Sequence, residues 1–212
     1  MNTKQTKSRS LLLLAVLLIA STAIGWAAKP ESIKKKEISR SYDVSLSDLL
    51  TTDNRYGNTT ITHWNKNEVS IRVEIEAKAE NDDAAQATLD RVQVEIKKSG
   101  NTVSAVTSLK EQKWNGNRNE RFTINYFISM PSKLAINLAQ KYGNITIQVK
   151  YGNLNAGSFT KSLDLEVKYG NVDINDITKA YLYLGYCGNA SIGNASQLEV
   201  DNKYSNLSIK KC

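Results

Sequence analysis

The chain has 212 residues, of which 41% are hydrophobic, and its formal net charge is +7. This length suffices for one substantial domain or two small ones. Basic and acidic residues are mixed along the predicted strands, which excludes a dedicated nucleic-acid surface of clustered Lys and Arg. We therefore expect no nucleic-acid partner.

The first 27 residues have the order of a secretory signal peptide. Basic residues precede an apolar run from Leu11 to Ala20, and Gly25-Trp26-Ala27 places small residues before a cleavage point. An uncleaved anchor helix is the alternative, because the apolar stretch is near the lower limit for spanning a bilayer. No later stretch is apolar enough to span a membrane. We predict an exported protein in the periplasm, on the outer-membrane surface or outside the cell.

Residues 28–40 are predicted to be a basic leader. Cleavage after residue 27 leaves 25 basic and 21 acidic residues, a net charge of +4, and Lys34-Lys35-Lys36 supplies most of this excess. Attraction of this run to anionic lipid or glycan is the alternative to a solvated leader. In an oxidising compartment Cys187 and Cys212 could form a disulfide, but their different phases in the repeat favour two separate thiols.

Residues 41–131 are predicted to form a mainly β region with one short helix. Apolar and polar residues alternate from Val69 to Ile75, as in a half-buried strand. Asn81 offers an N-cap, and the acidic residues after it fit the first turn of a helix near 84–90. Further alternating runs continue up to Pro131.

Residues 132–212 divide into units of nine residues, and alternate units end in Gly-Asn or a variant of it. Two units give a period near eighteen. Such a short fixed period is typical of a solenoid, in which each unit buries its apolar face against its neighbours. Within a unit the apolar positions, such as Ile145, Ile147 and Val149, face inward along a short strand. We therefore predict an all-β fold with one short helix and a β-solenoid of about eighteen residues per coil in this part.

The Tyr-Gly-Asn motif is predicted to mark the corners between strands. Glycine is expected there because a corner needs positive φ, and the following Asn also tolerates that region. Stacked Asn side chains would bond to backbone or to each other between coils, while the tyrosines would cover the edge of the core. The same motif at Tyr56-Gly57-Asn58 predicts a related turn and strand upstream. The predicted corner residues are Tyr142, Gly143, Asn144, Tyr151, Gly152, Asn153, Tyr169, Gly170, Asn171, Gly188 and Asn189.

With its Tyr-Gly-Asn motifs, its Asp-Asp-Ala-Ala helix and the strand that ends at Pro131, the chain resembles a family of bacterial putative adhesins of unknown function. The resemblance covers roughly residues 40–212. It implies an exported β-solenoid related to head-GIN-type adhesin domains, and it carries over no catalytic residue. The chain departs from the pattern where Ser205 replaces Gly and Cys187 replaces Tyr.

The segment Tyr181–Leu184 departs most from the repeat. If the following Gly-Asn corner fixes the register, its two tyrosines face inward and its two leucines face outward, and a slip of one residue reverses all four. One interpretation is a bulge that returns the leucines to the core. The other is an exposed patch of Tyr181, Tyr183 and Tyr186 that binds sugar, protein or a second copy of the chain.

No residues have the pattern of a catalytic or metal centre, and we expect no cofactor. His63, the single histidine, lacks the partners that a metal site or a catalytic triad needs. The segment from Asp173 to Asp176 lacks the glycine and distal glutamate of a calcium loop. The opposed carboxylates that glycoside hydrolysis requires are not evident either.

These features predict a non-catalytic envelope or cell-surface protein that presents a β-solenoid face for adhesion or ligand binding, with a glycan or a surface protein as partner. The alternative is a periplasmic structural or assembly protein that self-associates through the solenoid ends, although Lys210 and Lys211 would protect that edge. A polysaccharide-processing enzyme is the third hypothesis.

Overall fold

The computed structural model describes residues 31–110 and 120–212. The signal peptide predicted for residues 1–27 lies outside the described residues. The lower part of the molecule contains β1 (Ser32–Asp43), β2 (Leu49–Tyr56), β3 (Thr59–Trp64), β4 (Glu68–Ala79), α1 (Asp82–Arg91), β5 (Val92–Ser99), β6 (Thr102–Leu109) and β7 (Arg121–Pro131). The upper part contains β8 (Ala135–Tyr142), β9 (Ile145–Val149), β10 (Leu154–Ala156), β11 (Phe159–Lys168), β12 (Val172–Ile174), β13 (Ile177–Gly185), β14 (Asn189–Lys203) and β15 (Asn206–Lys211).

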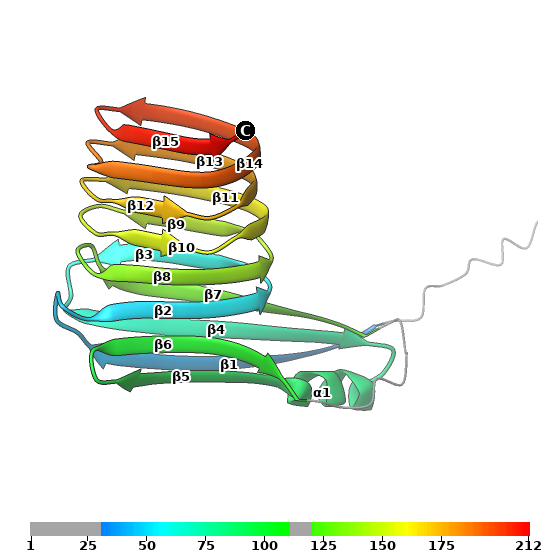
Figure 1. Cartoon of the computed structure of the whole chain (residues 1–212). Coiled ribbons are helices and arrows are strands. Elements are labelled where there is room, and N and C mark those ends of the chain that lie inside the picture. The colour runs from blue at the N-terminus through cyan, green and yellow to red at the C-terminus, as the bar shows by residue number, and fades with distance from the viewer. Residues whose placement is uncertain (1–30, 111–119) are drawn as a thin grey trace, which may run out of the picture.

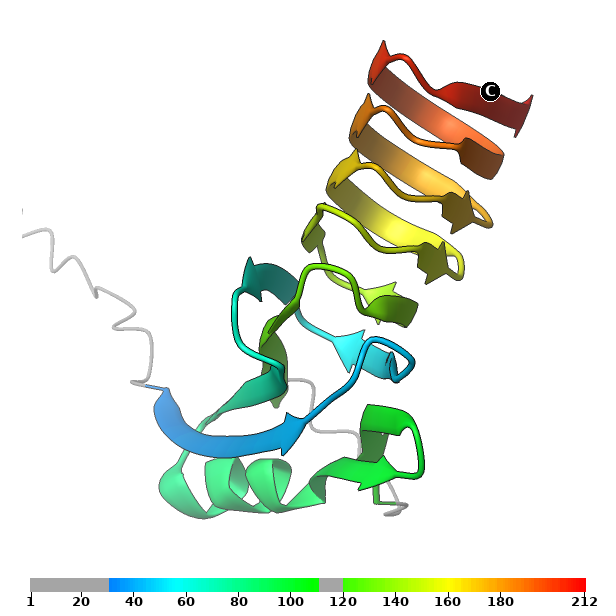
Figure 2. The ribbon, with the colours of Figure 1, turned by 90° about the vertical axis from the view of Figure 1, so that its left-hand side faces the viewer.

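The strands form two layers that face each other across the core (Figure 1, Figure 2). Layer A contains, in order of pairing, β1, β4, β7, β3, β9, β11, β13 and the second half of β14. Layer B contains β5, β6, β2, β8, β10, β12, the first half of β14 and β15. Because β14 passes between the layers, the sheet runs along one layer and returns along the other. The prediction of a mainly β fold with one helix is confirmed.

Parallel pairing repeats up the stack with a step of one coil. Leu154 of β10 pairs with Ile136 of β8 and with Val172 of β12, each eighteen residues away along the chain. The strands themselves vary from three residues in β10 to fifteen in β14, so the structure does not contain the predicted uniform units of nine residues. Hydrogen bonds between coils maintain the spacing of eighteen residues between these paired positions, whereas the bends at the corners set the length of each strand.

Inward-facing side chains of both layers meet in one continuous hydrophobic cluster. Along β9 the first, third and fifth residues are buried and the two between them are exposed, as the period of two requires. The cluster extends from Leu50 in β2 to Ile192 in β14. Since β2 pairs with β8 and β3 with β9, the lower and upper parts share one core.

The helix α1 lies at the lower end of the stack (Figure 1). Oδ1 of Asn81 accepts a hydrogen bond from the backbone N–H of Ala84 at 2.9 Å, which caps the first turn. Acidic residues occupy that turn and Arg91 occupies the last, an arrangement that complements the helix dipole. The helix spans 82–91, where the sequence predicted one near 84–90.

The basic leader predicted for residues 28–40 differs from the structure. From Ser32 onward this segment is β1, which pairs antiparallel with β4 along its whole length. Ile38 packs against the hydrophobic core, and Nζ of Lys34 lies 2.6 Å from a carboxylate oxygen of Asp82. The acidic partners of these lysines come from segments distant in sequence, so a local count of basic residues could not reveal them.

Candidate binding surface

The outer face of layer A carries two tyrosines near the upper end of the stack. Tyr181 and Tyr183 lie on β13, which pairs with β11 on one side and with β14 on the other. Their partners on these strands are Asp164 and Glu199 for Tyr181, and Glu166 and Asp201 for Tyr183. Neighbouring strands lie about 4.8 Å apart, so each ring has a carboxylate on both sides.

The register of β13 decides that the tyrosines face outward. An irregularity in β11 between Phe159 and Ser162 shortens the step to β13 from eighteen residues to seventeen. Leu182 and Leu184 consequently point into the core, with 3% and 0% of their surface exposed, while Tyr181 is 42% exposed. The interpretation that returns the leucines to the core is therefore confirmed, but the irregularity lies in β11 and not in the segment Tyr181–Leu184; the outward tyrosines are its consequence.

Lysine side chains cover part of the two rings. Nζ of Lys168 and Nζ of Lys203 lie 5.1 and 5.2 Å from the ring centre of Tyr183. Nζ of Lys179 lies 5.0 Å from the ring centre of Tyr181. A cation over an aromatic face is attracted by about 0.5–1 kcal/mol at an exposed site. Tyr183 has lysines from both neighbouring strands over its ring, so Tyr181 is the more open of the two.

The carboxylates of this face divide into bound and free ones. Lys168 donates a hydrogen bond of 2.6 Å to Glu166, and this bond raises the pKa of the lysine. The carboxylates beside Tyr181, those of Asp164 and Glu199, form no close ion pair with any residue that the structure describes, although contact with Tyr181 and attraction to Glu199 raise the pKa of Lys179. The surface around Tyr181 therefore offers carboxylate acceptors that form no hydrogen bond within the described residues, next to an exposed aromatic ring.

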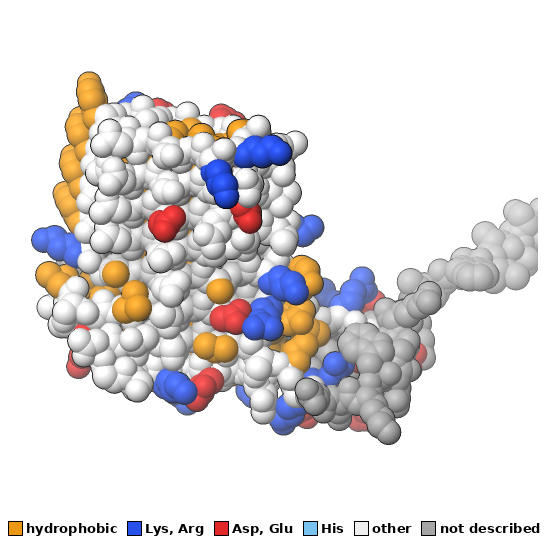
Figure 3. All heavy atoms as spheres, viewed as in Figure 1, with side chains coloured by type: hydrophobic (Ala, Val, Ile, Leu, Met, Phe, Trp, Pro, Cys, Tyr) orange, Lys and Arg blue, Asp and Glu red, His pale blue; other side chains and the backbone are white. Residues whose placement is uncertain are grey.

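Tyr186, the third predicted binding tyrosine, lies off this face, at the corners that lead from layer A to layer B. There it belongs to a column of stacked rings with centres 5.1–5.3 Å apart and interplanar angles of 10–20°. The tyrosine column consists of Tyr151, Tyr169, Tyr186 and Tyr204. Figure 3 shows hydrophobic side chains gathered along the upper part of this edge. The structure thus brings Tyr181 and Tyr183 together and separates Tyr186 from them.

Glycine is needed at the corners mainly because the backbones of successive coils lie close together, and less because of the positive φ that the sequence predicted. Of the four predicted glycines only Gly143 has a positive φ, of 139°. At three upper corners the positive φ falls on the tyrosine, with values of 54–57° in Tyr169, Tyr186 and Tyr204. A Cβ on Gly170 would lie 1.9 Å from the carbonyl oxygen of Gly152 in the coil below. The stacked backbones therefore leave no space for a side chain.

The sequence predicted that Cys187 replaces a corner tyrosine, and this prediction is wrong. Tyr186 keeps that place in the tyrosine column, and Cys187 is an additional residue before Gly188. Its side chain is buried, with Sγ 3.5 Å from the carbonyl oxygen of Val167. Cys187 and the exposed Cys212 are both free, which confirms the prediction of two separate thiols.

Asparagine side chains link the corners of successive coils. Oδ1 of Asn153 accepts a hydrogen bond from the backbone N–H of Asn171 at 3.0 Å, and Oδ1 of Asn171 accepts one from Asn189 at 2.9 Å. At the opposite edge the backbone N–H of Asn144 donates to Oδ1 of Asn58 at 3.0 Å. The upstream Tyr-Gly-Asn motif therefore forms the corner directly below the one at residues 142–144.

Two other polar residues considered in the sequence, His63 and Asp176, have surroundings that lower their pKa. His63 lies half-buried in β3, and this burial lowers its pKa. Asp176 accepts hydrogen bonds from the backbone N–H and the side-chain amide of Asn194, at 3.0 and 2.7 Å, and these bonds lower its pKa. Across residues 31–110 and 120–212, no group of three or more His, Cys, Asp and Glu side chains is arranged to hold a metal ion.

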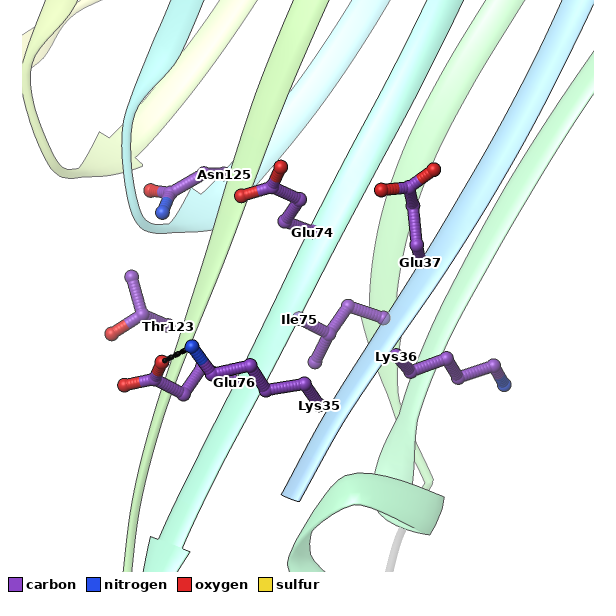
Figure 4. Close-up of a pocket in the computed structure, with 8 residues that line it drawn as sticks. All are labelled: Lys35, Lys36, Glu37, Glu74, Ile75, Glu76, Thr123 and Asn125. Atoms are coloured by element: carbon purple, nitrogen blue, oxygen red, sulfur yellow. Dashed lines mark ion pairs between the residues drawn. The ribbon is translucent and has the colours of Figure 1, made fainter. Parts of the chain in front are cut away.

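A hollow lies at the lower end of the molecule, over β1, β4 and β7 (Figure 4). Its carboxylates are engaged by basic side chains: Lys35 lies 3.0 Å from Glu76, and Arg72 contacts Glu74. Hydrogen bonds from Lys78 and Lys35 lower the pKa of Glu76. The carboxylates of this surface are therefore paired with basic side chains, whereas those beside Tyr181 form no close ion pair within the described residues.

The pairing of the tyrosines with Glu199 and Asp201 was not predicted from the sequence. Alignment of the repeats on their Gly-Asn corners conceals the step of seventeen residues from β11 to β13. Alignment of Tyr169 with Tyr186 would have revealed the shorter step and placed both tyrosines of β13 on the outer face.

Fold and surface together define a mainly β protein whose two layers of stacked strands expose an aromatic and acidic face. Within the described part of the chain, no helix has the length and apolar character needed to cross a membrane.

No family model and no curated protein matches the chain. A putative cell adhesion protein from Clostridium sporogenes is similar in structure, with 11% identity and a TM-score of 0.42 over 84% of this chain and 100% of that one. A putative adhesin from Bacteroides fragilis has 16% identity and a TM-score of 0.31 over 84% and 97%. A putative adhesin from Parabacteroides distasonis has 10% identity and a TM-score of 0.36 over 83% and 80%. These levels of similarity assign neither a family nor a function.

Proposed function

We propose that the protein is a non-catalytic, exported envelope or cell-surface protein that binds a ligand through the outer face of layer A. The observation that carries this proposal is the exposed ring of Tyr181 between two carboxylates that form no close ion pair within the described residues. Exposed aromatic side chains on an ordered surface are typical of binding sites. We further propose that residues 132–212 are a short β-solenoid whose coils of seventeen or eighteen residues keep this face rigid.

The chemistry of the face suits a ligand that has both an apolar surface and hydrogen-bond donors. The ring of Tyr181 offers apolar contact, while Asp164 and Glu199 accept charge-assisted hydrogen bonds from hydroxyl or amino groups. Leu182 anchors β13 from the core side, so the backbone that carries Tyr181 is in place before the ligand arrives and little backbone entropy is lost on binding. A glycan and a surface protein both have groups of this kind.

Binding of the full chain to an array of glycans and extracellular-matrix proteins tests the proposal. We expect Tyr181→Ala to weaken the strongest interaction about fivefold or more, because an aromatic contact of roughly 1 kcal/mol is lost, and Tyr181→Phe to retain most of it. Tyr204→Ala is the matched control, since this tyrosine is 81% exposed but lies off the face. Equal binding by the wild-type chain and Tyr181→Ala would refute the proposed site.

A structural or assembly role in the periplasm is the second candidate. The observation in its favour is the uppermost coil, where β15 pairs with β14 alone and Ile209 is 37% exposed. Lys210 and Lys211 lie on the same strand and oppose edge-to-edge pairing by their charge. Protease treatment of intact cells separates the two functions, because a surface protein is cleaved at once and a periplasmic one only after the outer membrane is broken.

A further inference from the structure

A shallow groove crosses the outer face of layer B, on the side opposite the tyrosine face. Residues of β2, β8, β10, β12 and β14 line it, so it runs perpendicular to five neighbouring strands. Figure 3 looks onto this layer, and the surface over its upper strands is mostly neither charged nor hydrophobic. The lining of the groove combines apolar surface with mostly uncharged polar side chains, which distinguishes the groove from the acidic and aromatic face of layer A.

One wall of the groove consists of asparagines from the corner ladder. Oδ1 of Asn153 and Oδ1 of Asn171 each accept the backbone N–H of the next coil, at 3.0 and 2.9 Å. These bonds decide which end of each amide faces the protein. The Nδ2 groups of the same two side chains donate no hydrogen bond to any residue that the structure describes. They are therefore donors of fixed orientation that remain available to a ligand.

The other wall is a row of exposed side chains, one from each of four neighbouring strands. Asn137, Asn155, Asp173 and Ser191 occupy the same register position on β8, β10, β12 and β14. None of them forms a hydrogen bond within the described residues. Successive members are separated by the distance between strands, about 4.8 Å. The groove thus presents a regular series of unpaired donors and acceptors along the axis of the stack.

The charge and chemistry of the lining select among polymers. Asp173 is the only charged side chain that lines the groove, and no lysine or arginine does. A polyanion needs basic side chains along its path, and Asp173 would repel it. Amides and hydroxyls each combine donors with acceptors, which matches the hydroxyl groups of sugars. The apolar side chains of Leu49 and Ala135 at one end of the groove can contact the carbon-bound hydrogens of a sugar ring.

We propose that this groove binds a neutral polysaccharide that lies along the stack and crosses successive strands. The periodic walls give each sugar unit a similar set of partners, so the affinity rises with the number of units that the groove holds. The inference is independent of the tyrosine face, because the two surfaces belong to opposite layers and share no residue.

The test measures retention of the full chain on an array of neutral and anionic glycans at low and high salt. We expect retention on neutral polysaccharides that does not fall at high salt, since no ion pair is formed. The double variant Asn137→Ala/Asn155→Ala should weaken it about tenfold, the effect of losing roughly 1.4 kcal/mol of hydrogen bonding. Both side chains are exposed and unpaired, so the fold remains intact. Thr146→Ala, at an exposed position on the outer face of layer A, is the matched control.

Three outcomes would overturn the proposal: no retention on any neutral glycan, salt-sensitive retention on anionic glycans alone, or equal binding by the double variant. Retention of an unfolded polypeptide such as carboxymethylated casein in place of all glycans would also contradict it. Tyr181→Ala separates the two binding sites. If this variant loses a ligand while retention in the groove is unchanged, the tyrosine face acts independently; if it changes nothing, only the proposed function of layer A fails.

Discussion

The lower and upper parts of the molecule share a core but are held together in different ways. In the lower part β1, β4 and β7 pair antiparallel, β5 pairs antiparallel with β6, and a helix closes the end. In the upper part every strand pairs parallel with the strand one coil away. The lower part therefore depends on single contacts between distant segments, whereas the upper part repeats one contact geometry in each coil.

Because of this difference, the two parts should be sensitive to different kinds of mutation. Repeating coils rely on the distance between stacked backbones, so a residue that alters this distance affects the whole upper part. A single buried contact of the lower part, by contrast, can be removed and replaced without changing the backbone. Mutations that distinguish backbone spacing from side-chain pairing consequently separate the two parts.

The largest expected effect is that of Gly170→Ala in the upper part. Its Cβ would lie 1.9 Å from the carbonyl oxygen of Gly152, a backbone atom that cannot move aside alone. We expect a loss of about 3 kcal/mol or more in the free energy of unfolding, measured by urea denaturation. Gly157→Ala is the control, because its Cβ would meet only the carbonyl oxygen of Leu138, at 3.8 Å.

Hydrogen exchange of Gly170→Ala then tests whether the two parts are separable. We expect faster exchange throughout residues 132–212 and unchanged exchange in α1 and β4, because contacts in a stack connect mainly neighbouring coils. Uniform acceleration over the whole chain would show that the shared core makes both parts one cooperative unit.

In the lower part we expect a smaller effect from Tyr126→Phe. The hydroxyl of Tyr126 lies 2.7 Å from Oγ1 of Thr107 in the core, and burial raises the pKa of this tyrosine to about 12. The variant leaves Oγ1 of Thr107 buried without a partner, a cost of about 1–3 kcal/mol. Thermal and urea denaturation measure it.

The double variant Tyr126→Phe/Thr107→Val provides the check on this explanation. It removes both hydroxyls, so it should recover most of the lost stability. If the double variant is no more stable than Tyr126→Phe, the loss does not come from an unpaired hydroxyl and the contrast with the upper part is not one of side-chain pairing.

Local patterns in the sequence predicted the strands, the helix and the positions of the corners. Alternation placed Ile145 and Val149 in the core, and the cap at Asn81 located α1 to within two residues. The location of the irregularity in β11 was missed, because the repeats were aligned on their Gly-Asn corners and this alignment hides the shift in pairing between β11 and β13. The partners of β1 and the carboxylates beside Tyr181 were missed for a different reason: they are set by contacts between segments distant in sequence.

In the asparagine ladder we expect a modest effect from Asn171→Ala. The variant removes the acceptor of the Asn189 N–H, a bond of 2.9 Å at an exposed corner. Water replaces this partner in part, so the loss should be about 1 kcal/mol. Asn155→Ala is the matched control, because the side chain of this exposed asparagine forms no hydrogen bond in the described structure and its loss should change stability by less than about 0.5 kcal/mol. Equal losses in the two variants would contradict a stabilising role of the ladder.

The smallest expected effect is on acid stability, and it distinguishes how the two parts hold a carboxylate. The backbone N–H of Asn194 is the main cause that lowers the pKa of Asp176 in the upper part, while in the lower part a hydrogen bond from Lys34 lowers the pKa of Asp82. A lowered pKa in the folded state contributes stability above the ordinary value of 3.8, and this contribution disappears as the pH falls through the folded value.

In Asp176→Asn and Asp82→Asn the corresponding pH dependence should be absent. High salt should weaken the contribution of Asp82, whose main partner is a cation, and affect that of Asp176 less, because its main partner is an amide without net charge and the attraction of Lys210 is the smallest cause. The difference is measured by the urea midpoints of the wild-type chain and both variants, above and below this pH and at two salt concentrations. Equal salt sensitivity at both sites would contradict the distinction between a charge pair in the lower part and a backbone ladder in the upper part.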